Sequence, residues 1–447
     1  MVQSYDQLTL LSNLIDDALI QGADAADAVV FDASSVSVSC RLGDLEKLER
    51  SESKDLGLRV FVGKQQAIVS STDFEESTLR DVVTRAVAMA KAAPEDPYCG
   101  IALPEQLITD TPELEIYDPK EPSNESLIEA ARTAEDAARS VDGVTNTEGA
   151  ETGWSNSRIA IATSNGFAQT YATSSHSIAA SVLAGEGTEM ERDYDYNSSV
   201  YYVDLGDPAK IGRNAGERAV NRLNARKVET QQVPVVYDPR VSSGIVQHFS
   251  SAINGSSVSR GTSFLKEKMG QKVFADGINI VEDPHRNRGL RSKPFDAEGL
   301  PNYRKYLAED GVLKTWVLDL ASARQMGLQS TGNAARGTAS PPSPAVTNLY
   351  MEAGKQSPAD LISDITSGFY VTELIGMGIN IVTGDYSRGA TGFWIENGEI
   401  SYPVTEMTIA GNLKDMFTNL SPADDLEFKF GTDAPTLRID GMTVAGS

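Results

Sequence analysis

The residues that most limit the chemistry of this chain are its three histidines, His176, His248 and His285, which lie far apart in the sequence. A serine nucleophile needs a general base, usually histidine, and a zinc peptidase needs imidazoles presented together with a glutamate that activates water. His248 lies in a predicted helix over residues 243–253, where Phe249 follows it directly. From these residues alone we predict a structural histidine, and the sequence assembles no catalytic or metal-binding set.

Short motifs of other site classes are incomplete. Residues 376–378 begin a dinucleotide-binding pattern, but Ile381 stands where the last glycine is required. Residues 193–197 have the opening spacing of a calcium loop, but Ser198 replaces the necessary glycine, so an acidic strand is the better interpretation. The sequence contains no P-loop and no G-x-S-x-G elbow.

The segment over residues 383–417 is the most suggestive part of the sequence. A glycine-flanked polar turn at 384–389 precedes an aromatic strand with Trp394, and a tight hairpin follows. Glycines allow close approach of a ligand or a second strand, and Arg388 can pair with a carboxylate. A purely structural turn with an exposed arginine is an equally good interpretation.

Composition excludes several classes of function. The 447 residues include 39 Lys and Arg against 63 Asp and Glu, a formal charge of −24, whereas nucleic-acid binding needs a basic surface. The two cysteines, Cys40 and Cys99, form no disulfide framework and no cysteine-rich zinc site. The N-terminus lacks the pattern of a signal peptide, and no apolar run approaches the ~18 residues of a membrane helix. We therefore expect a cytoplasmic protein with no nucleic-acid or membrane partner.

Helical and alternating patterns are mixed along the chain, which favours an α+β fold. Hairpins are predicted at residues 165–166, 310–311 and 397–398, where Asn-Gly or Asp-Gly separates strand-like runs. The proline-rich stretch 94–122 is the best linker candidate. We predict an N-terminal α/β domain over 1–112, a middle α+β domain over 113–232 and a C-terminal, mainly antiparallel β domain over 233–447.

Longer stretches carry a resemblance to a known family. They are NTEGAETGWSNS (146–157), EMERDYDY (189–196), SGIVQHFSSAINGSSVSRGTSFL (243–265), PFDAEGL (294–300), QMGLQSTGNA (325–334), VTELIGMG (371–378) and the segment 383–417. Over essentially its whole length the chain resembles the TldD/PmbA family, and within it chains of the PmbA (TldE) type.

The resemblance implies a division of labour between two kinds of subunit. TldD-type subunits are zinc metallopeptidases that use H-E-x-x-x-H on a helix and a later cysteine followed by glycine. PmbA-type chains pair with them, and the assembly cleaves short or unfolded peptides in an enclosed chamber. Carried onto this chain, the first histidine falls on His248, the glutamate on Phe249, the second histidine on Ile253 and the cysteine near residues 430–431. One of the four groups is therefore present.

The leading hypothesis is a subunit that lacks catalytic and metal-binding residues of its own, helps to bind peptide and closes the chamber. Zinc is expected in the TldD-type partner, and a homodimer is possible when the chain is alone. The candidate residues for the peptide groove or the seam between subunits are His248, Gly384, Asp385, Tyr386, Ser387, Arg388 and Trp394.

Two alternatives stay open at the level of sequence. In one, His248 joins His176, His285 or carboxylates to form an unorthodox site in an independently active hydrolase. In the other, the chain is a regulatory binding protein of the DNA-gyrase-modulator type, an older label of this family, and its acidity mimics nucleic acid.

Overall fold

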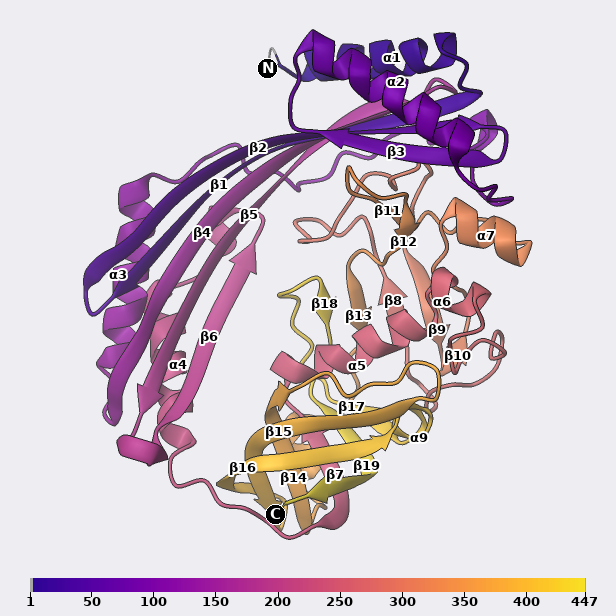
Figure 1. The fold of residues 1–447 in the computed structure, drawn as a ribbon. Helices are drawn as coiled ribbons and strands as arrows, with labels where there is room; N and C mark the ends of the chain where they lie inside the picture. Colours follow the sequence, from indigo (N-terminus) through magenta and orange to yellow (C-terminus); the bar gives the residue numbers. More distant parts are fainter. Residues whose placement is uncertain (1–2, 447) are drawn as a thin grey trace.

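The computed structural model describes residues 3–446, which form an arched sheet and a lobe held on its concave side (Figure 1). The sheet is six-stranded, in the order β3-β2-β1-β4-β5-β6. Its strands are β1 (Ala25–Arg41), β2 (Asp44–Val62), β3 (Gln65–Ser71), β4 (Val144–Thr163), β5 (Ala168–Ala184) and β6 (Glu191–Ser199). All neighbours in this sheet pair antiparallel, and β6 forms one edge.

Two pairs of helices cover opposite ends of the long strands (Figure 1). They are α1 (Gln3–Ile20) and α2 (Glu76–Ala92) at one end, and α3 (Asn124–Arg139) and α4 (Pro208–Asn221) at the other. Each pair buries its own hydrophobic cluster against the sheet. The sheet runs across the predicted boundary between residues 112 and 113, because β1 pairs with β4. The first two predicted domains thus share one sheet.

The lobe on the concave side, the C-terminal lobe, is built mainly from antiparallel strands, as predicted. Five strands close into a barrel, since β16 (Glu399–Asn412) pairs with both β15 (Asp385–Glu396) and β19 (Leu437–Ala445). The other barrel strands are β7 (Gln231–Tyr237) and β14 (Ser367–Ile375), and β17 (Leu420–Pro422) is added to β19. This closure buries the largest hydrophobic cluster of the chain as described.

Shorter elements complete the C-terminal lobe. One small sheet contains β8 (Ile280–Glu282), β9 (Lys305–Glu309), β10 (Val312–Leu313), β13 (Leu349–Met351) and β18 (Thr432–Asp433). The strands β11 (Ala334–Ala335) and β12 (Ser343–Pro344) pair with each other. The helices are α5 (Pro239–Ala252), α6 (Gly255–Ser259), α7 (Leu320–Met326), α8 (Pro358–Ile362) and α9 (Leu413–Thr418). Among residues 3–446, none of the helices combines the length and apolarity that a bilayer span requires.

The three predicted hairpins are confirmed, and two have the backbone that their sequence favours. Asp310 and Gly311 between β9 and β10 have φ of 48° and 75°, and Asn397 and Gly398 between β15 and β16 have φ of 53° and 82°. Two consecutive positive φ angles characterise the turns whose twist matches paired strands. The third predicted turn joins β4 to β5 at Gly166.

One end of the arched sheet is fixed to the C-terminal lobe through a buried ionic cluster, here called the β1 contact. Asp27 of β1 accepts hydrogen bonds from Arg59 of β2 and from Arg336, which follows β11. All three side chains are almost completely buried. Neighbouring strand β2 approaches the C-terminal lobe so closely that a Cβ on Gly57 would lie 2.3 Å from the carbonyl oxygen of Thr338.

A second ionic cluster, the β6 contact, joins the edge strand to the barrel side. Asp193 of β6 lies 2.8 Å from Arg240 of α5 and 3.4 Å from Arg222, which follows α4. Arg222 also reaches Glu373 of β14 at 2.7 Å and Glu191 at 3.4 Å. Asp193, Arg222 and Arg240 each have more than one ion-pair partner.

Candidate functional site

The predicted site residues His248, Tyr386 and Arg388 are brought together by α5 and β15. Asp238 caps α5 by accepting a hydrogen bond from the backbone N–H of Arg240, and Pro239 occupies the first turn. The half-buried ring of His248 meets the ring of Tyr386 edge-on, with centroids 6.0 Å apart. Burial, followed by the charge of Arg388, lowers the pKa of His248 to about 4. This imidazole is therefore neutral at neutral pH.

The surroundings of His248 do not fit the zinc that the family implies. Phe249 and Ile253, which align with the glutamate and the second histidine, are fully buried. The Phe249 ring packs edge-on against Phe274, with centroids 4.9 Å apart. Among residues 3–446, no group of three or more His, Cys, Asp or Glu side chains lies close enough to hold a metal ion. A zinc site needs at least three protein donors, and the residues described around His248 provide too few donor side chains.

The other two histidines lie on different elements. His176 of β5 is completely buried, with Nε2 3.5 Å from Asp118 Oδ2, and burial lowers its pKa. His285, after β8, places Nε2 2.7 Å from Asn302 Oδ1. Each histidine thus has its own polar or aromatic neighbours, and the structure groups neither with His248.

The glycine-flanked turn is held by its own hydrogen bonds. A Cβ on Gly384, whose φ is +89°, would lie 2.8 Å from the Asn412 side-chain oxygen. Asp385 accepts hydrogen bonds from Thr383 Oγ1 at 2.6 Å and Asn412 Nδ2 at 3.1 Å, which lower its pKa. The backbone N–H of Ser387 donates to the carbonyl of Gly378 at 2.7 Å. These hydrogen bonds fix the backbone at the start of β15, the part of the strand that contains Tyr386 and Arg388.

The remaining candidates differ in how accessible they are. Ser387 is exposed, and Arg388 Nε donates to the carbonyl of Ile375 at 3.3 Å. Trp394 is only 4% exposed and packs in the barrel core, its ring 6.3 Å from that of Phe369. Tyr386 is also buried, with its ring toward His248. Trp394 is thus placed in the core and away from any surface groove.

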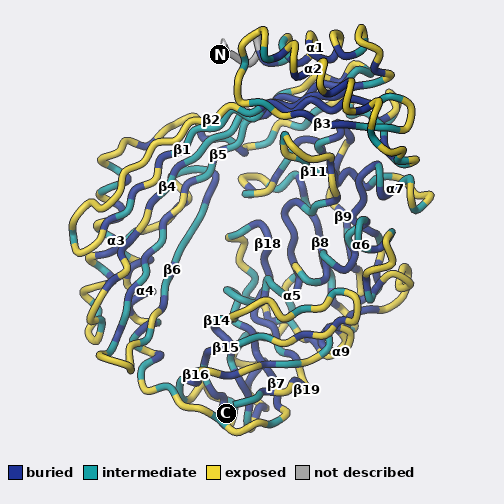
Figure 2. Tube along the Cα trace, in the orientation of Figure 1, coloured by how far each residue is buried: buried dark blue, intermediate teal, exposed yellow. Residues whose placement is uncertain are grey.

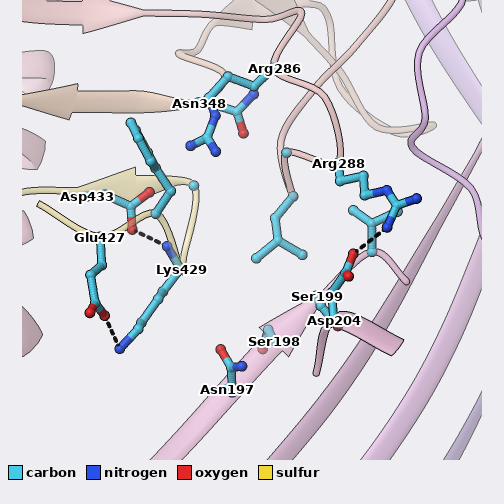
Figure 3. Close-up of a pocket in the computed structure, with 15 residues that line it drawn as sticks. Asn197, Ser198, Ser199, Asp204, Arg286, Arg288, Asn348, Glu427, Lys429 and Asp433 are labelled. Atoms are coloured by element: carbon cyan, nitrogen blue, oxygen red, sulfur yellow. Dashed lines mark hydrogen bonds and ion pairs between the residues drawn. The ribbon is translucent and has the colours of Figure 1, made fainter. Parts of the chain in front are cut away.

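A cleft that the sequence did not indicate lies between β6 and the C-terminal lobe. Its volume is about 490 Å³. Figure 3 shows its polar and charged lining, namely Asn197, Ser198, Ser199 and Asp204 on the arched-sheet side and Arg286, Arg288, Asn348, Glu427, Lys429 and Asp433 on the side of the C-terminal lobe. The three lobe segments involved, 286–290, 348 and 427–433, are distant in sequence, so only the fold brings them together.

A smaller cavity lies farther along β6 and shares Glu427, Lys429 and Asp433 with this cleft. Tyr196 of β6 stacks on Phe430, with centroids 4.6 Å apart. The second cavity has a volume of about 230 Å³ and is lined by Asp195, Tyr196 and Phe430 among others. Residues of the edge strand β6 therefore line two neighbouring cavities, and the stacked pair lines the smaller one.

Comparisons with known proteins agree along the whole chain. The PmbA/TldA metallopeptidase domain 1, central domain and C-terminal domain match residues 26–90, 117–223 and 230–446. Metalloprotease PmbA of Escherichia coli O157:H7 is 37% identical over 95% of this chain and 93% of its own length. The PmbA homologue of Haemophilus influenzae is 36% identical over 95% and 92%. A TldD homologue of Buchnera aphidicola is 26% identical over 57% of each chain.

Solved structures share the same architecture. A protein of Bacteroides thetaiotaomicron described as a candidate modulator of DNA gyrase has a TM-score of 0.91 and 27% identity, with both chains covered completely. TldE from Thermococcus kodakarensis has a TM-score of 0.81 at 22% identity over 98% of this chain and all of its own, a likeness of fold. The sequence resemblance is thus confirmed, and this chain belongs to the PmbA/TldD metallopeptidase family.

Proposed function

We propose that this chain is the PmbA-type subunit of a cytoplasmic peptidase assembly, in which a TldD-type partner supplies the zinc and this chain binds unfolded peptide and closes the chamber. The observation that carries the proposal is the replacement of both motif partners of His248 by buried apolar residues. Phe249 and Ile253 occupy the positions that align with the family's glutamate and second histidine, in a chain that keeps the family's fold. A lone imidazole holds zinc weakly, and Phe249 stands where the family's glutamate would activate water.

The edge strand β6 supports a role in peptide binding. It ends the six-stranded sheet, and cavities of about 490 Å³ and 230 Å³ lie beside it. An extended peptide can add to such an edge through main-chain hydrogen bonds, which tolerate many side-chain sequences. This mode suits an assembly whose substrates are varied unfolded peptides.

The loop between β14 and β15 supports a seam with a partner subunit. The loop exposes Met377 and Val382, the end of β14 exposes Ile375, and Met377 is 95% exposed. Arg388, one of the predicted seam residues, donates to the carbonyl of Ile375 and so lies at the base of this loop. Contiguous exposed apolar side chains are typical of surfaces that a partner covers.

The test compares the chain alone, the chain with a TldD-type partner, and variants of the loop. We expect zinc binding and chelator-sensitive peptide cleavage by the pair, and neither by the lone chain. Met377→Glu should weaken association with the partner. Met89→Glu, a matched change at an exposed methionine of α2, should not. Stoichiometric zinc together with proteolysis by the lone chain would contradict the proposal and favour the independently active hydrolase.

A regulatory role is the second candidate, because the similar Bacteroides structure is described as a candidate modulator of DNA gyrase. The charge of −24 is compatible with mimicry of nucleic acid. Inhibition of DNA supercoiling by the lone chain, at concentrations that leave peptide cleavage by the pair unchanged, would favour this role over the peptidase subunit.

A further inference from the structure

One cation of the cleft beside β6, Arg286, has no ion-pair partner among residues 3–446. Arg288 lies 2.7 Å from Glu115 and 2.9 Å from Asp204, and Lys429 lies 2.5 Å from Glu427. Arg286 differs from both. Among the residues that the structure describes, no carboxylate oxygen lies within 4.0 Å of its guanidinium nitrogens.

Arg286 is nevertheless held in a defined place. Its guanidinium carbon lies 3.6 Å from the centroid of the Phe428 ring, and the ring of Tyr350 packs edge-on against Phe428 with centroids 5.0 Å apart. Burial lowers the pKa of Arg286, and the nearby charges of Asp433 and Asp283 offset this effect only in part. A stacked guanidinium keeps its N–H groups free at the edge, where they can form the paired hydrogen bonds that carboxylates accept.

The rest of the lining determines the charge of a suitable ligand. Three cations, Arg286, Arg288 and Lys429, face three carboxylates, Asp204, Glu427 and Asp433. Asp433 is already committed, because its Oδ1 accepts the backbone N–H groups of Lys429 and Phe430 at 2.9 Å. A phosphate or nucleic acid would bring several negative charges next to these carboxylates. A single carboxylate needs only the one cation that lacks a partner.

We propose that this cleft binds the free C-terminal carboxylate of an extended peptide, with Arg286 as its anchor. The inference rests on the proposed role in peptide binding and adds which end of the bound peptide lies in the cleft. The volume of about 490 Å³ exceeds what a carboxylate alone fills, and the cleft opens along Asn197 and Ser198 of β6. The last residues of a peptide then lie beside the edge strand, and its carboxylate meets the Arg286 guanidinium.

The experiment uses the full chain in complex with its TldD-type partner, inactivated by removal of zinc. The probe is a fluorescein-labelled, unstructured hexapeptide made once with a free C-terminus and once as the C-terminal amide. Loss of one charge-assisted pair of hydrogen bonds should weaken binding of the amide about tenfold, read by fluorescence anisotropy. Arg286→Gln should bind both forms as weakly as the amide, and Arg286→Lys should retain part of the preference.

Arg304→Gln is the matched control, since Arg304 also lies over a ring, that of Tyr306, but has Glu352 as its partner and lies outside the cleft. It should keep the full preference for the free acid. Equal binding of both peptides by the wild type overturns the carboxylate site and leaves the peptide-binding role standing, whereas no binding of either peptide overturns both. Acetate that competes at the concentration of the peptide overturns the assignment to a peptide terminus.

Discussion

Two ionic contacts join the arched sheet to the C-terminal lobe, and they differ in how many partners their buried charges have. In the β1 contact, one carboxylate, Asp27, serves two guanidiniums, Arg59 and Arg336, and all three are removed from water. In the β6 contact, Asp193 is equally buried, but Arg222 and Arg240 have further partners in Glu373 and Asp238. The β1 contact depends on the single carboxylate of Asp27. In the β6 contact, each arginine has a second carboxylate partner besides Asp193.

This difference bears on where the two parts can separate. Removing one partner of a buried ion pair leaves an uncompensated charge, which costs more than the pair contributes when intact. At the β1 contact, loss of the Asp27 carboxylate leaves two buried arginines without an anion. At the β6 contact each arginine retains an anion. Since β6 also lines the proposed peptide cleft, the contact that costs less to break lies on the same strand as the cleft.

The largest effect is expected when the β1 contact loses its carboxylate. Asp27→Asn leaves Arg59 and Arg336 buried without an anion, and we expect a loss of about 3–5 kcal/mol in unfolding free energy. Urea unfolding followed by circular dichroism measures it. Glu52→Gln is the control, because this carboxylate on the exposed half of β2 is solvated, and its midpoint should not move (Figure 2). A loss no larger than that of the control would remove the contrast between the two contacts.

A smaller effect is expected at the β6 contact. Asp193→Asn leaves Arg222 with Glu373 at 2.7 Å and Arg240 with Asp238 at 3.7 Å. We expect a loss of about 1–3 kcal/mol, the cost of an incompletely satisfied buried group. The same urea titration gives the value. If the loss equals that of Asp27→Asn, the additional partners do not share the charge as their distances suggest.

Local signals in the sequence predicted much of the fold. The Asp310-Gly311 and Asn397-Gly398 turns are hairpins because glycine and asparagine adopt positive φ readily, a property of the residues themselves. The helix predicted over 243–253 exists, although it begins at Pro239 because Asp238 caps it. Such features depend on neighbours within a few positions, and sequence reasoning can therefore reach them.

Features that depend on distant partners were predicted incompletely. The residue pattern alone marks two strand-like runs, 28–34 and 35–40, but β1 is continuous over Ala25–Arg41 because β2 and β4 pair with it. Residues 44–55 are highly charged and have no run of apolar residues typical of a strand, yet they extend β2 through this pairing. Exposed charged residues are common on strands that carry an unpaired edge.

The candidate site shows the same limit. The sequence indicated His248 and Arg388, and the structure places both near Tyr386. It also indicated Trp394, whose ring the barrel buries. Arg286 was missed although it lies in the arginine-rich run RNRGLR, since its lack of an anionic partner depends on residues 427–433, far along the chain. Residue type suggests chemistry, but the absence of a neighbour is a property of the fold.

The smallest expected effect is the change in unfolding free energy per pH unit that a buried carboxyl group near the β1 contact causes. Near the β1 contact, burial raises the pKa of Glu298 to about 8, and the nearby Asp296 adds to the rise. The folded chain then keeps a proton that the unfolded chain releases above pH ~4.5, so stability falls as pH rises from there to about 8, by at most about 1.4 kcal/mol per pH unit. Glu298→Gln cannot ionise and should show a shallower decline, measured by urea unfolding between pH 5 and 8. Glu309→Gln, an exposed site of the same lobe, should follow the wild type. Parallel slopes for wild type and Glu298→Gln would mean that Glu298 is charged in the folded chain, and the β1 contact would then hold two anions and lose its dependence on Asp27 alone.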